Sequence, residues 1–130
     1  VATIIATSEG QTGTATVTVT QAPLVTLSTL TLSQIHTFAV SPCPQAIGTV
    51  TITNVSSGPI SWTATTPHAA LTYSTSSGGT VAAGATSQLT VQFNCAQASS
   101  FITTLTVTAQ NAAGSVVQNY PISVNLTVIP

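Results

Sequence analysis

The sequence predicts an all-β protein, an antiparallel β-sandwich of about seven strands with an N-terminal β-hairpin extension. Two observations predict this fold class. Apolar residues alternate with threonine and serine at a period of two over most of the 130 residues, as strands with one buried face require. Clusters of Gly, Pro, Asn and Ser separate these segments at short intervals, whereas no segment has the period of an amphipathic helix.

The N-terminal residues form the first expected hairpin, with strands at 2–7 and 14–20 around a turn at 9–13. A junction follows at 21–23, because proline fixes φ and cannot donate to a strand ladder. We therefore divide the chain into an extension, residues 1–22, and a sandwich, residues 23–130. The expected sandwich strands are 24–32, 35–41, 47–54, 59–65, 69–75, 86–94, 101–109 and 116–129, and turns are expected at 41–44, 56–59, 76–79 and 111–114.

One face of each expected sandwich strand is apolar, so these faces should form the core. Burial of such a side chain contributes about 1.5–3 kcal/mol, most of which is offset by the lost chain entropy. The expected core residues are Val50, Ile52, Ile60, Trp62, Ala64, Leu71, Tyr73, Leu89, Val91, Phe93, Phe101, Thr103, Leu105, Val107, Ala109, Ile122, Val124, Leu126 and Val128.

Charge is almost absent: Glu9 is the only charged side chain, and there is no Lys, Arg or Asp. An average domain is about a quarter charged. Paired catalytic carboxylates and a Ser–His–Asp triad are therefore impossible, and phosphate-backbone binding has no cation to use. We expect a chain that is not an enzyme, that holds no cofactor and that binds no nucleic acid.

His36 and His68 are expected to be loop histidines with satisfied hydrogen bonds, since their spacing forms no metal motif. We expect no metal site.

No apolar run approaches about 18 residues, so no membrane span is expected. No secretory leader opens the sequence, and we interpret it as a mature form or a fragment.

Two family resemblances follow from particular segments. The segments GTVTITNVSSGPISWTAT, STSSGGTVAAGATSQLTVQFN and FITTLTVTAQNAAGS make residues 24–130 resemble immunoglobulin-like sandwiches of the BACON and ASPM–SPD-2–Hydin type. The segment ATIIATSEGQTGTATVTVT makes residues 1–20 resemble the closing hairpin of a bacterial immunoglobulin-like group 2 domain. These families imply a secreted or cell-surface spacer, adhesive module or wall-binding appendage, and no catalytic residues.

Cys43 and Cys95 fall in two connections that lie at the same end of an immunoglobulin-like sandwich, so a disulfide is expected between them. It implies an oxidising compartment; two free thiols are the alternative.

Trp62 is expected in the core, with a sugar-stacking platform as the alternative. Tyr73 and Tyr120 are better exposed candidates for glycan contact. Asn54 and Asn125 match the N-glycosylation pattern as well.

The hairpin needs a partner, because an isolated two-stranded hairpin is marginally stable in water. Ala15, Val17 and Val19 share one face and are candidates for an intersubunit strand. Strand addition uses main-chain hydrogen bonds and needs no charge. The alternatives are that residues 1–20 are the stub of an adjacent domain, or extra strands of the same sandwich.

The leading hypothesis is therefore a structural subunit of an extracellular or cell-surface filament, assembled from copies of itself by β-strand pairing. The alternative is a non-catalytic spacer, adhesion or carbohydrate-binding module of a larger secreted protein, in which glycans or a cell surface are the partners.

Overall fold

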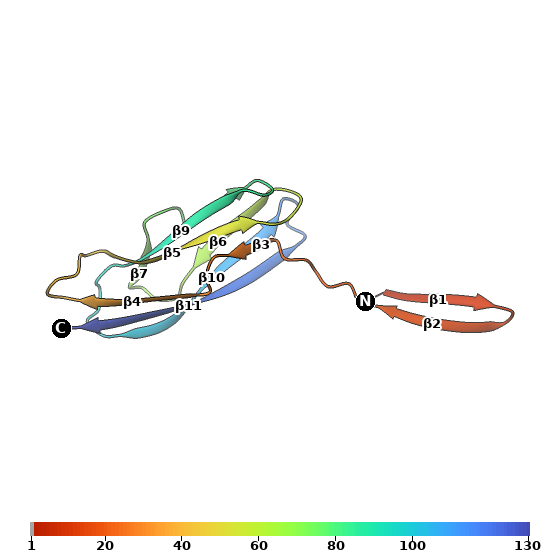
Figure 1. The fold of residues 1–130 in the computed structure, drawn as a ribbon, viewed down its shortest axis with the longest axis horizontal. Helices are drawn as coiled ribbons and strands as arrows, with labels where there is room; N and C mark the ends of the chain where they lie inside the picture. Colours follow the sequence, from red (N-terminus) through yellow and green to blue (C-terminus); the bar gives the residue numbers. More distant parts are fainter. Residues whose placement is uncertain (1) are drawn as a thin grey trace.

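The structure is a computed structural model that describes residues 2–130, and it is all-β, as the sequence predicts. Strands of a two-layer sandwich follow a separate N-terminal hairpin (Figure 1). The strands are β1 (Ala2–Ser8), β2 (Gln11–Val17), β3 (Val25–Leu27), β4 (Thr31–Thr37), β5 (Gln45–Asn54), β6 (Ile60–Thr65), β7 (Leu71–Tyr73), β8 (Gly78–Val81), β9 (Thr86–Phe93), β10 (Phe101–Asn111) and β11 (Val117–Ile129).

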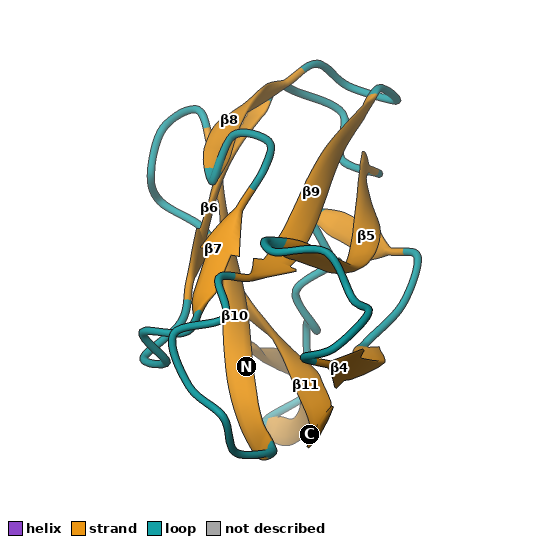
Figure 2. Ribbon diagram, turned by 90° about the vertical axis from the view of Figure 1, so that its left-hand side faces the viewer, coloured by secondary structure: helices purple, strands orange, loops and turns teal. Residues whose placement is uncertain are grey.

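The sandwich has a five-stranded sheet in the order β4-β11-β10-β6-β8 and a four-stranded sheet in the order β3-β5-β9-β7. Figure 2 shows the two layers with the loops gathered at their ends. Pairing is antiparallel except between β4 and β11, which run parallel. The expected strand at 24–32 does not exist as one unit. Its first part is β3 in one sheet, and β4 begins at Thr31 in the other, so the chain crosses between the sheets here.

The core lies between the two sheets and contains most of the expected residues. Val50, Ile52, Leu89, Val91 and Phe93 are completely buried on the four-stranded sheet. Trp62 is 1% exposed, which places it in the core as expected and rules out a sugar-stacking platform. Four expected core residues are only half-buried: Tyr73, Phe101, Thr103 and Val128. The sequence patterns did not indicate six further buried apolar residues: Leu24, Val25, Leu32, Ile47, Ala70 and Val81.

The predicted turn at 76–79 is wrong in its second half, because Gly78 and Gly79 belong to β8 and pair with Thr63 and Trp62 of β6. The tight packing explains the glycine at 78. A Cβ there would lie 2.7 Å from the backbone oxygen of Trp62. A glycine pair that resembles a turn in the sequence is here a close approach of two strands.

Candidate interaction surface

The N-terminal hairpin has two chemically different faces. Glu9 and Gly10 form its two-residue turn with φ values of 49° and 81°, the backbone that a tight hairpin turn requires. Cross-strand partners share a face, and the partners Ala2–Val17, Ile4–Ala15 and Ala6–Gly13 make one face apolar. The other face carries Thr3, Thr7, Thr12, Thr14 and Thr16 beside Ile5. We call the first set, Ala2, Ile4, Ala6, Gly13, Ala15 and Val17, the hairpin apolar face.

This face is open to solvent. Ile4 is 58% exposed and Val17 is 41% exposed, and every described residue from 2 to 23 is exposed. Figure 1 shows the hairpin at one end of the long axis, separated from the sandwich by a linker. Of the candidate intersubunit residues, Ala15 and Val17 lie on the apolar face, whereas Val19 lies in the linker and not in a strand. The hairpin therefore buries nothing against its own sandwich.

The end of the linker is fixed by Gln118 and Tyr120 of β11. The Gln118 amide donates to the Ala22 carbonyl at 2.9 Å, and its oxygen accepts from the Leu24 N–H at 2.8 Å. The Tyr120 hydroxyl donates to the same Gln118 oxygen. These bonds anchor the chain where it enters β3. Sequence reasoning missed Gln118, because nothing in the local pattern distinguishes it from a solvent-exposed glutamine.

Of the two tyrosines considered for glycan contact, Tyr120 has a hydrogen-bonded hydroxyl and Tyr73 has a buried one. The Tyr120 oxygen also accepts a bond from the Val25 N–H at 3.4 Å. The Tyr73 hydroxyl is buried and has no hydrogen-bond partner among the described residues. Burial raises the pKa of the Tyr73 phenol above its usual value. The Tyr120 hydroxyl is thus already hydrogen-bonded and the Tyr73 hydroxyl is enclosed; glycan contact through these residues stays a prediction.

Asn54 was expected as a glycosylation acceptor, and this expectation is wrong for the folded protein. Its side chain is completely buried. The amide nitrogen donates to the carbonyls of Gly58 and Val81, each at 2.9 Å. The amide oxygen accepts from the N–H and the hydroxyl of Ser56 at 2.9 and 2.7 Å. No atom of the amide is left for a glycan. Asn125 lies exposed on β11, and its glycosylation stays a prediction.

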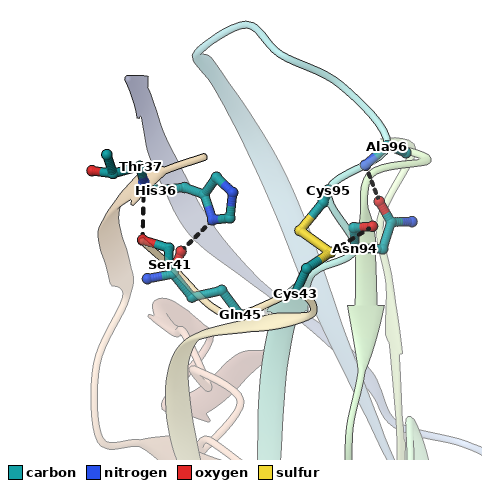
Figure 3. Close-up of a disulfide and its surroundings, with 8 residues drawn as sticks. All are labelled: His36, Thr37, Ser41, Cys43, Gln45, Asn94, Cys95 and Ala96. Atoms are coloured by element: carbon teal, nitrogen blue, oxygen red, sulfur yellow. Dashed lines mark hydrogen bonds between the residues drawn. A yellow bond between two sulfur atoms is a disulfide. The ribbon is translucent and has the colours of Figure 1, made fainter. Parts of the chain in front are cut away.

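The far end of the sandwich is closed by a disulfide between Cys43 and Cys95, with Cα atoms 6.1 Å apart (Figure 3). Beside it, His36 is 1% exposed, and its Nδ1 lies 2.6 Å from the Gln45 amide oxygen. The expectation of a loop histidine is wrong for His36, which belongs to β4. The buried ring packs edge-on against Phe38 and Phe93. This end is therefore an ordered polar and aromatic cluster.

His68 lies in the connection between β6 and β7. Its Nδ1 accepts from the Ala70 N–H at 3.3 Å, and its ring stacks on Phe101 with centroids 3.8 Å apart. Residues 2–130 contain no group of three or more metal-ligating side chains. Nor do they include a helix that could cross a membrane.

A groove with a volume of about 520 Å³ lies where the linker meets the sandwich. Its walls come from residues 21–24, 55–59, 111–113 and Val116. It contains no aromatic and no charged side chain. Carbohydrate sites usually present an aromatic face with a polar edge, which this groove lacks.

Searches with the sequence find no matching protein family and no matching curated protein. The fold, in contrast, is similar to many solved structures. A PapD-like domain of human CEP192, also described as an ASH domain, superimposes with a TM-score of 0.69 at 10% identity, over 88% of this chain and 94% of that one. The C. elegans protein WR4, a member of the MSP family, gives 0.58 at 12% identity, over 82% and 99%.

Two structures that contain chaperones are also similar. The YadV chaperone gives a TM-score of 0.63 at 8% identity, over 82% of this chain and 52% of the chaperone. The Salmonella enterica SafA pilin in complex with the SafB chaperone gives 0.62 at 13% identity, over 85% and 57%. The chain thus spans about half the length of these two chains. At such identities the comparisons show the fold alone: an immunoglobulin-like sandwich of the PapD-like and MSP kind.

Proposed function

We propose that the chain is a non-catalytic structural module of an extracellular or cell-surface protein, in which the hairpin completes an adjoining β-domain. The observation that carries this proposal is the contrast between the two parts. The sandwich has a closed core of its own, whereas the hairpin presents an apolar face and two unpaired strand edges. The family resemblance of residues 1–20 to the closing hairpin of a bacterial immunoglobulin-like domain gives the class of the adjoining β-domain.

The arrangement of the chain supports a spacer. The hairpin lies at one end of the long axis and the C-terminus at the other (Figure 1), as in modules that are joined end to end. Gln118 and Tyr120 hold the linker at its base, which limits how the two parts can swing. The disulfide fits an oxidising location outside the cytosol.

A filament subunit is the second candidate function. It is favoured by exposed apolar side chains at the end opposite the hairpin: Ile35 is 56%, Ile102 is 74% and Ile129 is 43% exposed. These residues share the outer face of the five-stranded sheet, as their pairing register shows. The hairpin apolar face of one copy would cover them in the next. Such a head-to-tail contact does not close on itself and would propagate.

Sedimentation velocity over a range of concentrations separates the two functions. The spacer predicts a monomer throughout, with rapid hydrogen exchange of the β1 and β2 amides, because no partner protects them. The filament predicts large species that disappear when residues 1–22 are deleted. The deletion leaves all of the core residues in place, so the sandwich should remain folded in both cases. Large species that persist after the deletion would contradict both.

The non-catalytic assignment rests on the single carboxylate of the sequence. It predicts no turnover of ester, glycoside or peptide substrates. If the purified Glu9→Gln variant hydrolyses any of these substrates, the chain has a catalytic group other than its single side-chain carboxylate, and the non-catalytic assignment is wrong.

A further inference from the structure

Side-chain hydroxyls bind outward backbone groups at several places along the edges of the two sandwich sheets, where no charge guards the edge. Unpaired N–H and C=O groups at a sheet edge attract other strands, and proteins usually protect edges with charged side chains such as lysine. The only charged side chain of this chain, Glu9, lies at the tip of the hairpin, far from the sandwich edges (Figure 1). Hydroxyl groups bind the edge backbone instead.

Strand β4 is the longest edge. The Ser123 N–H donates to Leu30 and the Phe38 N–H donates to Ile129, so the even-numbered residues face β11. The odd-numbered residues therefore face the open side. At Thr31 the Thr29 hydroxyl accepts from the N–H at 3.2 Å and donates to the C=O at 2.9 Å.

The other end of the β4 edge is covered in a similar way. The Thr37 N–H donates to the Ser41 hydroxyl at 3.0 Å, and the Thr37 carbonyl accepts from Ser41 N–H at 2.8 Å (Figure 3). The Ile35 carbonyl accepts from the Gln45 amide at 3.2 Å. On the open side of β4, only the backbone groups of Ser33 and the N–H of Ile35 have no such bond. This stretch is too short to form several ladder hydrogen bonds with another strand.

The same device recurs at two other places on the five-stranded sheet, the β8 edge and an overhanging end of β11. On β8, the Ser76 hydroxyl accepts from the Gly78 N–H at 3.3 Å and donates to the Gly78 carbonyl. Where β11 extends past the start of β10, the Ser100 hydroxyl accepts from the Val128 N–H at 2.8 Å and donates to its carbonyl at 3.5 Å. In each case one hydroxyl satisfies both backbone groups of one residue, since it can donate and accept at once.

The four-stranded sheet is covered by side-chain hydroxyls as well. The Thr75 hydroxyl accepts from the Thr90 N–H at 3.0 Å and donates to the Gln88 carbonyl at 3.3 Å, beyond the end of β7. At the opposite edge, the Tyr120 hydroxyl receives the outward N–H of Val25 in β3. Hydroxyl contacts of this kind therefore occur at both edges of both sheets.

We infer that these hydroxyl caps protect the edges of the sandwich against strand pairing, in the role that charges have in other β-proteins. The inference is independent of the proposed function. The hairpin strands, and the part of β11 that precedes its pairing with β4, carry no such cap among residues 2–130, so intermolecular β-pairing is expected at these stretches and not at the capped ones.

The test removes three caps from the full chain, with Thr29→Val, Ser76→Ala and Ser100→Ala together. Three other hydroxyls form no hydrogen bond within residues 2–130, and their removal by Thr104→Val, Ser57→Ala and Ser123→Ala is the matched control. Both proteins keep the hairpin, so any association through it is common to them. We expect loss of the monomer peak in size-exclusion chromatography for the cap variant alone. Equal monomer fractions in the two variants would overturn the inference.

A second variant separates open edges from simple destabilisation. Ser33→Lys and Thr80→Lys, added to the cap variant, place charges on β4 and β8 without restoring any capping bond. The monomer should return while the denaturation midpoint stays low. If lysines leave the association unchanged, the cap variant associates through unfolded chains and the inference fails.

Discussion

Asn54 joins three segments of the sandwich through one buried amide: the end of β5, the 56–58 turn and β8. The Asn54→Ala substitution removes the side-chain partner of the Val81 carbonyl, in a buried bond, and of the Gly58 carbonyl and the Ser56 N–H, in partly buried ones. We expect the free energy of unfolding to fall by roughly 2–4 kcal/mol, since each unsatisfied buried group costs about 1–3 kcal/mol. Chemical denaturation measures this change. Asn125→Ala, at an exposed position, should stay within about 0.5 kcal/mol of wild type.

Removal of the Tyr73 hydroxyl should have the opposite effect on the free energy of unfolding, because this buried hydroxyl has no hydrogen-bond partner. Tyr73→Phe should not destabilise the protein and should raise the free energy of unfolding by up to about 1 kcal/mol. A fall of the denaturation midpoint would instead reveal a bond to the hydroxyl.

The pH dependence of stability provides a second readout at Tyr73. Burial raises the pKa of the phenol in the folded state above its value of 10.0 in the unfolded chain. Above pH 10 the folded state therefore holds more protons than the unfolded state, and stability decreases as pH rises. Thermal unfolding between pH 9 and pH 11 should show this decrease in wild type and a smaller one in Tyr73→Phe. The same slope in both proteins would assign it to other groups.

At the scale of elements, β8 depends on a glycine for the closeness of its approach to β6. A Cβ at Gly78 would lie 2.7 Å from the Trp62 carbonyl oxygen, whereas one at Gly79 would approach nothing closer than 3.8 Å. Gly78→Ala should destabilise the fold by roughly 1–3 kcal/mol because the backbone must move. Gly79→Ala should be within about 0.5 kcal/mol of wild type. Urea denaturation of the pair tests the strand assignment, since a turn at 76–79 would tolerate both.

The elements also show why the hairpin and the sandwich differ in their need for a partner. The hairpin consists of two strands with no buried side chain, and such a unit has little free energy of its own. The sandwich edges are bonded locally by hydroxyls. Threonine and serine thus serve two purposes in this chain: they favour the strand conformation, and they cap the strand edges.

For the whole molecule, the Cys43–Cys95 disulfide links positions 52 residues apart at the end of the sandwich that lies away from the hairpin. Its loss in the Cys43→Ala, Cys95→Ala double variant should lower the free energy of unfolding by roughly 4 kcal/mol, because the unfolded chain regains the entropy of an open loop. Denaturation in the presence and absence of reductant measures the effect. Wild type that is insensitive to reductant would indicate that the two thiols are not bonded.

The sequence by itself determined the fold class, most of the core and the disulfide. Alternation at period two is a local property, and it fixes which side of a strand is apolar regardless of the strand's neighbours. It also determined that Glu9 is the only charged side chain, because composition needs no structure. The predicted apolar faces of β5, β6, β9, β10 and β11 are buried in the structure, which confirms this part of the prediction.

Only the tertiary structure decided which polar groups are used inside the fold. Asn54 resembles a glycosylation acceptor in the sequence, and burial by β8, distant in the chain, turns it into a core bond. His36 becomes buried because Gln45 and Phe93 close over it. The capping roles of Ser76 and Ser100 depend on which backbone groups remain at an edge after the sheets have formed. Such partners are set by contacts between remote segments, and local patterns carry no information about them.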